Sequence, residues 1–163
     1  MIKKILVPLD GSEFAKSALP YAESLALKYD AELLLVQSLQ PMLVVSQFVE
    51  RAMAFYGPRL LHNKNIASMY LRSVQDKLRA PARTVVLEGR PIADAIIEIA
   101  SQEAVSLIVM TKHSRSGLDR WLADHVADEV LQHAPCPVFL INVPKMKDGS
   151  YKDLSTVPSQ LIS

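Results

Sequence analysis

The sequence predicts one α/β domain in which a doubly wound parallel sheet is covered by helices on both faces. Short apolar runs, typical of strands buried on both sides, alternate with segments whose apolar residues recur every three or four positions. This alternation indicates β-α-β units, and their right-handed crossovers leave only doubly wound topologies. The length of 163 residues suits a single domain.

The composition is that of an ordinary globular protein. Half of the residues are hydrophobic, and 18 Lys and Arg against 17 Asp and Glu leave a formal net charge of +1. The overall charge therefore gives no reason to expect a nucleic-acid partner. The longest uncharged stretch, residues 33–49, contains several polar residues, so we expect no membrane span.

The amino terminus and the cysteine usage predict a cytoplasmic protein. Met1 leads directly into a predicted strand, with no signal-peptide pattern. Cys136 is the only cysteine, so the fold has no internal disulfide. Because Cys136 opens an apolar run, we expect a buried and unreactive thiol.

The first two strands flank a helix. Ile5–Leu9 is a continuous apolar run, and it ends at Asp10-Gly11-Ser12, where Ser12 or Asp10 can cap the next helix. Helical spacing continues from Glu13 to Tyr29, and Leu33–Val36 forms the second buried strand.

The middle of the chain is harder to interpret. Residues 40–58 contain prolines and a glycine, yet Met42–Tyr56 is apolar enough to be part loop and part short helix. An amphipathic helix follows and ends before Pro81, and Arg83–Leu87 is the third strand. The apolar positions of that helix are Ala67, Leu71, Val74 and Leu78.

The last part continues the alternation. A turn at residues 88–91 places Pro91 at the first position of a helix whose inward residues are Ile92, Ala95, Ile96 and Ile99. Then follow a strand (Ser106–Met110), a polar loop (Thr111–Gly117), a helix from about Asp124 to His133 and a fifth strand (Pro137–Val143). We expect residues 1–143 to form the domain and residues 144–163 a polar tail.

The loops after the first and fourth strands are the best candidates for a binding site. In doubly wound sheets, ligands bind beyond the carboxyl ends of the strands, where the strand order reverses. Both loops are polar and contain glycine. We therefore expect them to flank the crevice.

Several segments resemble the universal stress protein family, in order and at the right spacing over residues 2–143. They are Ile5 to Ser12, Glu88-Gly89-Arg90-Pro91 with Ala95-Ile96-Ile97, Leu107 to Met110, His113 to Leu118, and Ala134 to Val138. The resemblance implies a stress-response role, five parallel strands in the order 3-2-1-4-5, and a homodimer paired through the fifth strand at Val138 to Val143. The alternative is that a helix or the tail covers this strand edge.

Family members that bind ATP share a glycine pattern after the fourth strand: Gly, two residues, Gly, nine residues, then Gly with Ser, Thr or Asn. Glycine lets backbone N–H groups approach phosphate, and the last pair opens a helix whose amino terminus attracts anions. Here these positions are Thr111, Ser114, Asp124 and His125. A carboxylate about 4 Å from a phosphate costs roughly 1–4 kcal/mol, so Asp124 alone could weaken binding about 10- to 1000-fold. Alternatively, Asp124 serves only a structural role, as the N-cap of a helix over residues 125–133.

Other residues match the family's nucleotide site. Asp10 matches an acidic residue near the ribose and adenine, although capping the first helix explains it equally well. Lys112, Arg115 and Arg120 make the following loop basic, which suits a smaller anion, but such a loop is more often merely solvated. The complete candidate set, for a weak or vestigial site, is Pro8, Asp10, Val36, Met110, Thr111, His113, Ser114, Arg115, Ser116, Asp124, His125 and Val126.

We expect neither catalysis nor a metal site. A Ser-His-Asp set could be drawn from Ser12, Ser114, Ser116, His113, His125 and Asp124, but no nucleophile-elbow pattern is present. The histidines and acids also lack zinc-ligand spacing. The family resemblance, together with the replaced glycines, implies a stress protein that binds ATP poorly, needs no cofactor, and acts through an unidentified protein partner or a small ligand. The alternative is an adenine-nucleotide module that holds ATP or AMP with a divergent phosphate loop.

Overall fold

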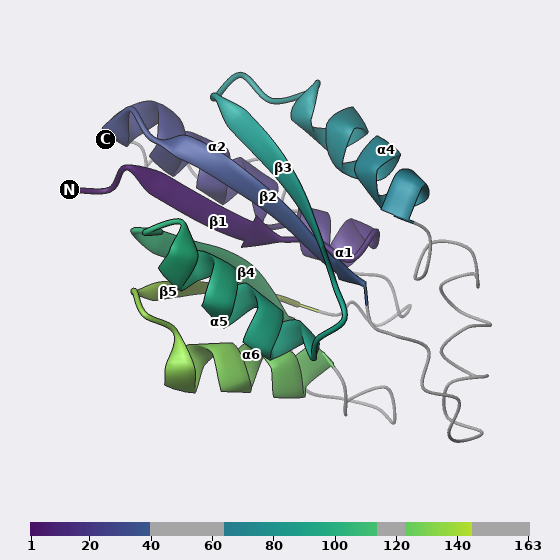
Figure 1. Ribbon diagram of the computed structural model, residues 1–163. Helices are drawn as coiled ribbons and strands as arrows, with labels where there is room; N and C mark the ends of the chain where they lie inside the picture. The colour runs from purple at the N-terminus through teal and green to yellow at the C-terminus, as the bar shows by residue number, and fades with distance from the viewer. Residues whose placement is uncertain (40–63, 114–122, 145–163) are drawn as a thin grey trace.

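Five parallel strands form one sheet in the order β3-β2-β1-β4-β5 (Figure 1). The structure is a computed structural model, and it describes residues 1–39, 64–113 and 123–144. The predicted fold class and the strand order implied by the family resemblance are both confirmed. The strands are β1 (Lys4–Pro8), β2 (Glu32–Leu39), β3 (Ala82–Glu88), β4 (Leu107–His113) and β5 (Val138–Val143).

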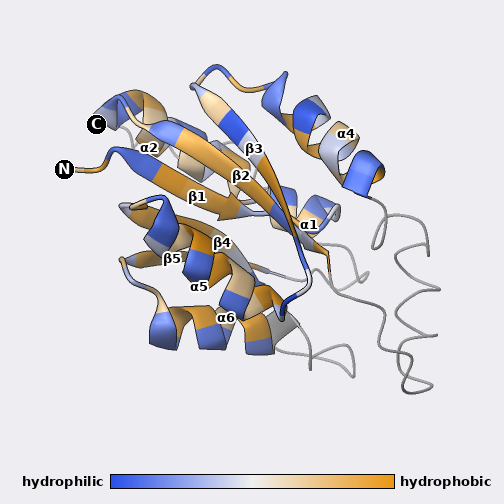
Figure 2. Cartoon of the chain, in the orientation of Figure 1, coloured by the Kyte–Doolittle hydropathy of each residue, from blue (hydrophilic) through white to orange (hydrophobic). Residues whose placement is uncertain are grey.

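Helices cover both faces of this sheet. One face packs against α1 (Glu13–Lys16), α2 (Leu19–Tyr29) and α4 (Lys64–Gln75). The other packs against α5 (Ile92–Gln102) and α6 (Ala123–His133). Figure 2 shows hydrophobic residues concentrated in the central strands, with hydrophilic residues along the helices. Two separate apolar clusters, one for each face, therefore form the core.

The first helical segment is two helices, which corrects the prediction of one helix from Glu13 to Tyr29. Pro20 has no N–H to donate to the carbonyl of Lys16, so a continuous helix would lose that hydrogen bond. The N–H groups of Ser17 and Ala18 instead bond three residues back, at 3.1 and 3.2 Å. The chain bends there, and α2 begins at Leu19.

The fourth strand is longer than predicted. Thr111, Lys112 and His113 belong to β4, where they pair with Ile141, Asn142 and Val143 of β5. Their polar side chains had indicated a loop beginning at Thr111. Pairing with an apolar neighbouring strand overrides that local preference.

Other differences are small. Pro91 lies at the N-cap of α5, one residue before the helix, and Cys136 is partly buried rather than fully buried. Burial raises the pKa of the Cys136 thiol, which keeps it protonated. Residues 40–63, the rest of the predicted polar loop and the tail after residue 144 lie outside the described residues. Within the described ranges, no helix is long and apolar enough to cross a membrane.

Candidate functional site

The strand order reverses between β1 and β4, so the carboxyl ends of these two strands flank the expected crevice (Figure 1). Pro8 ends β1 and pairs with Val36 of β2. Leu6 pairs with Ile108 of β4, which brings Met110 and Thr111 level with the end of β1. The register thus gathers Pro8, Val36, Met110 and Thr111 at one edge of the sheet.

The apolar candidates at this edge are packed into the core. Val36 is 1% exposed and Met110 is 6% exposed, and both belong to the cluster beneath α5 and α6. Val126, near the start of α6, is partly buried against the same cluster. These three side chains are thus positioned by core packing.

The loop after β1 is ordered by its own hydrogen bonds. The Asp10 carboxylate accepts from the Ser12 backbone N–H at 2.8 Å and from the Ser12 hydroxyl at 2.6 Å. The Ser12 hydroxyl oxygen in turn accepts from the Ala15 N–H at 3.1 Å, so Ser12 is the N-cap of α1. Gly11 has φ of +90°, a conformation that favours glycine. Asp10 is exposed and orients the cap without being the cap itself.

The amino end of α6 carries three further candidates. Asp124 is the second residue of this helix, which corrects the expectation that it is the N-cap. His125 is exposed on the same turn, and Val126 follows it. His113 is the last residue of β4. Ser114, Arg115 and Ser116 lie outside the described residues.

The basic charge at the end of β4 has a partner. The Lys112 ammonium forms an ion pair with the Asp128 carboxylate of α6. Both side chains are partly exposed. This pairing lowers the positive charge that Lys112 offers to an anion at the edge of the sheet.

Three polar side chains near this edge were missed by the sequence interpretation. Gln37 and Ser38 lie in β2, and Tyr70 lies in α4. The Gln37 carboxamide oxygen and the hydroxyls of Ser38 and Tyr70 are buried without a hydrogen-bond partner among the described residues. Two polar residues ending an apolar run were the available signal for Gln37 and Ser38.

The surroundings of Tyr70 favour the neutral form of its phenol. Burial raises the pKa of Tyr70, and the charges of Asp10 and Glu13 raise it further. The Gly11 backbone lowers this pKa, but its effect is the smallest of the four. The Tyr70 hydroxyl therefore stays protonated at neutral pH.

The described side chains form neither a catalytic triad nor a metal cluster. His133 contacts the Glu129 carbonyl through Nδ1 at 3.0 Å, and His125 has no hydrogen-bond partner among the described residues. Ser12 is bonded to Asp10. In the same part of the chain, no group of three His, Cys, Asp or Glu side chains could hold a metal ion.

Two relatives are similar over most of the chain. A universal stress protein of Methanocaldococcus jannaschii is 30% identical over 145 residues, which are 89% of this chain and 85% of that protein. A universal stress protein of Thermus aquaticus is 31% identical over 143 residues, which are 86% of this chain and 99% of that protein.

Solved structures share the fold. A universal stress protein from Lactobacillus plantarum aligns with a TM-score of 0.65 at 23% identity, covering 85% of this chain and 97% of its own. A universal stress protein in complex with cAMP aligns with a TM-score of 0.60 at 23% identity, covering 85% of this chain and 96% of its own. A universal stress protein from Archaeoglobus fulgidus in complex with dAMP aligns with a TM-score of 0.55 at 21% identity, covering 86% of this chain and 98% of its own.

A family model gives the same result as the individual relatives and structures. The model of the universal stress protein family matches residues 1–142, which include all five strands of the sheet except the last residue of β5. The relatives identified by sequence carry the same family name. This chain therefore belongs to the universal stress protein family.

Proposed function

We propose that this protein is a stress-response protein that does not bind ATP tightly and catalyses no reaction. It acts as a homodimer through contacts with a protein partner or a small ligand. The observation that carries this proposal is the replacement of every glycine in the family's phosphate-binding pattern, by Thr111, Ser114 and Asp124. His125 stands at the position of the small polar residue that follows.

Asp124 is the most consequential of these replacements. As the second residue of α6, it lies in the turn whose free N–H groups and helix dipole would otherwise attract a phosphate. A negative charge in that turn competes with the anion for the same N–H groups. The expected loss of ATP affinity is about 10- to 1000-fold.

The surroundings of this turn support the same proposal. Lys112 is already paired with Asp128, so its charge is partly satisfied without a ligand. Val36, which matches the family residue that lies against the adenine base, is buried in the core. A nucleotide would therefore meet a reduced positive charge at this edge of the sheet.

The proposed homodimer pairs through β5, the last strand of the sheet. This strand is at the end of the sheet and has β4 as its one neighbour among the described strands. Phe139 on β5 is 36% exposed, although its ring also contacts Tyr21 edge-to-face at 6.1 Å between centroids. An edge strand with an exposed aromatic side chain favours pairing with a second strand.

Restoring the charge and the glycines tests the nucleotide part of the proposal. Asp124→Asn keeps the side-chain shape and removes the charge, while Asp124→Gly with Thr111→Gly and Ser114→Gly rebuilds the glycine pattern. We expect each change to strengthen ATP binding, the triple variant at least about tenfold. Unchanged affinity in both variants would show that these positions do not control binding.

A second candidate function is weak binding of a nucleoside monophosphate. Two solved family structures hold cAMP and dAMP, which carry one phosphate rather than three. Asp10 is exposed at the carboxyl end of β1, where it can accept hydrogen bonds from a ribose. Titration with AMP separates the two candidates, because only this one requires AMP to bind and Asp10→Asn to weaken it.

A further inference from the structure

Two buried polar atoms lie on the same face of the sheet near the carboxyl end of β2. Gln37 is only 1% exposed, and its carboxamide oxygen has no hydrogen-bond partner among the described residues. The same is true of the Tyr70 hydroxyl. Burying such groups without partners disfavours the folded state, so native proteins nearly always satisfy them.

The strand register locates Gln37. Side chains alternate along β2, so Gln37 faces the same cluster as Leu33 and Leu35. It lies opposite Val86 of β3, which packs against that cluster. On its other side is Leu9, whose N–H donates to the Val36 carbonyl at 2.7 Å.

The direction of α4 locates Tyr70. Lys64 at the start of α4 forms an ion pair with Glu88 at the carboxyl end of β3, at 3.2 Å. Gln75 at its end donates to the Ala82 carbonyl at the opposite end of β3. Helical side chains lean toward the amino end of their helix, so the Tyr70 ring leans toward the carboxyl edge of the sheet.

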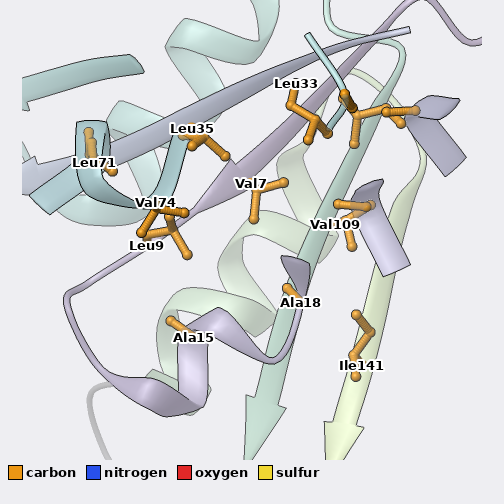
Figure 3. Close-up of a cluster of buried hydrophobic side chains, with 14 of the residues drawn as sticks. Val7, Leu9, Ala15, Ala18, Leu33, Leu35, Leu71, Val74, Val109 and Ile141 are labelled. Carbon is orange, nitrogen blue, oxygen red and sulfur yellow. The ribbon is translucent and has the colours of Figure 1, made fainter. Parts of the chain in front are cut away.

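Gln37 and Tyr70 therefore lie on the same face of the sheet, toward its carboxyl edge. Leu9 is the neighbour of Gln37, and Tyr70 packs against the cluster that contains Leu9. Figure 3 shows Leu9, Leu35, Leu71 and Val74 together in the cluster that both side chains adjoin. The unpartnered Ser38 hydroxyl faces the other side of the sheet and is separate from this pair.

We propose that Gln37 and Tyr70 form an internal site for one ordered water molecule, which ties α4 to β2. The two atoms are chemically complementary, because the carboxamide oxygen accepts and the phenol hydroxyl donates. They make no direct hydrogen bond. A water molecule that accepts from Tyr70 and donates to Gln37 satisfies both, as buried waters commonly do.

Thermal unfolding of three variants tests this site. Tyr70→Phe deletes only the hydroxyl, Gln37→Leu removes the carboxamide, and the third variant combines them. We expect each single change to lower Tm by roughly 2–6 °C. The double variant should fall no further than the worse single variant, because losing either partner releases the water. Tyr29→Phe removes a hydroxyl from a 42% exposed tyrosine and should leave Tm unchanged.

Two results would overturn the proposal. The first is a single variant whose Tm is unchanged or higher, because the deleted group then had no partner. The second is a double variant whose loss of Tm equals the sum of the two single losses, because the two groups then share no water. A crystal structure that resolves ordered water gives an independent answer. A water within hydrogen-bond distance of both atoms supports the site, and its absence there rejects it.

Discussion

The ion pair between Lys112 and Asp128 joins the carboxyl end of β4 to α6, at the edge of the sheet where a family ligand would bind. Both side chains are partly exposed, so the pair contributes little to the free energy of unfolding. Its larger effect is local. Asp128 partly neutralises a lysine at the carboxyl end of β4, where the candidate anion site lies.

Removing Asp128 should therefore strengthen anion binding. We predict that Asp128→Asn raises the affinity for ATP or AMP by about 2- to 5-fold at low ionic strength, with less effect in high salt. Calorimetric titration at two salt concentrations measures this. Glu129→Gln removes the same charge one residue along α6 and is the control. Equal affinities in the two variants would mean that the pair does not regulate the site.

The hydrogen bonds of Asp10 predict a role in stability as well as in binding. Asp10→Ala removes the acceptor that holds Ser12 as the N-cap of α1. We expect it to lower the free energy of unfolding by about 1 kcal/mol, measured by urea denaturation. Asp10→Asn keeps an acceptor oxygen and should lose less. Identical losses would show that charge, and not hydrogen bonding, is what the loop requires.

The carboxylate of Glu103 predicts a specific acid dependence. It accepts from Lys4 at 2.7 Å and from Arg83 at 2.6 Å, and these hydrogen bonds lower its pKa to about 2. A carboxyl whose folded pKa is below its unfolded value stabilises the fold above the unfolded pKa. That contribution is lost as the pH falls from about 4.5 toward 2.

Comparing Glu103→Gln with the natural protein isolates this contribution. The free energy of unfolding, measured by denaturant titration between pH 6 and pH 2, should fall less steeply with acid in the variant. Asp76→Asn, which removes an exposed carboxylate outside this cluster, is the control. A variant curve parallel to that of the natural protein would contradict the assignment.

The proposed dimer predicts an effect of the exposed aromatic residue on β5. Phe139→Asp should shift the protein from dimer to monomer in sedimentation velocity, because a charge opposes the burial of this edge. Leu131→Asp places the same charge on α6, at a side chain that is 50% exposed, and should leave the dimer intact. A natural protein that sediments as a monomer would reject the dimer directly.

The core elements could be predicted because each carries its own periodic signal. The apolar run of β1 and the helical spacing of α5 both point to the observed structure without long-range information. The end of β4 could not be predicted from its own residues, since Thr111 to His113 become strand residues only by pairing with β5. Pro20 indicated a break before α2, but the apolar residues around it kept helical spacing and favoured one continuous helix.

The candidate site was only partly predictable for a similar reason. Ser12 carries its capping role in its own sequence neighbourhood, and the structure confirms it as the N-cap of α1. The ion pair between Lys112 and Asp128 depends on the packing of α6 against β4, and the sequence around either residue does not predict that packing. Gln37 and Tyr70 belong to separate elements, so only the folded chain brings them to the same face of the sheet.

The central claim is that this family member does not bind ATP tightly. Calorimetric titration of the purified full chain with ATP and magnesium tests it most directly, combined with analysis of nucleotide released on denaturation. We predict no binding heat up to about millimolar ATP and no released nucleotide, since affinity falls about tenfold for each 1.4 kcal/mol lost. Micromolar binding, or ATP carried through purification, would contradict the role assigned to Asp124 and to the missing glycines.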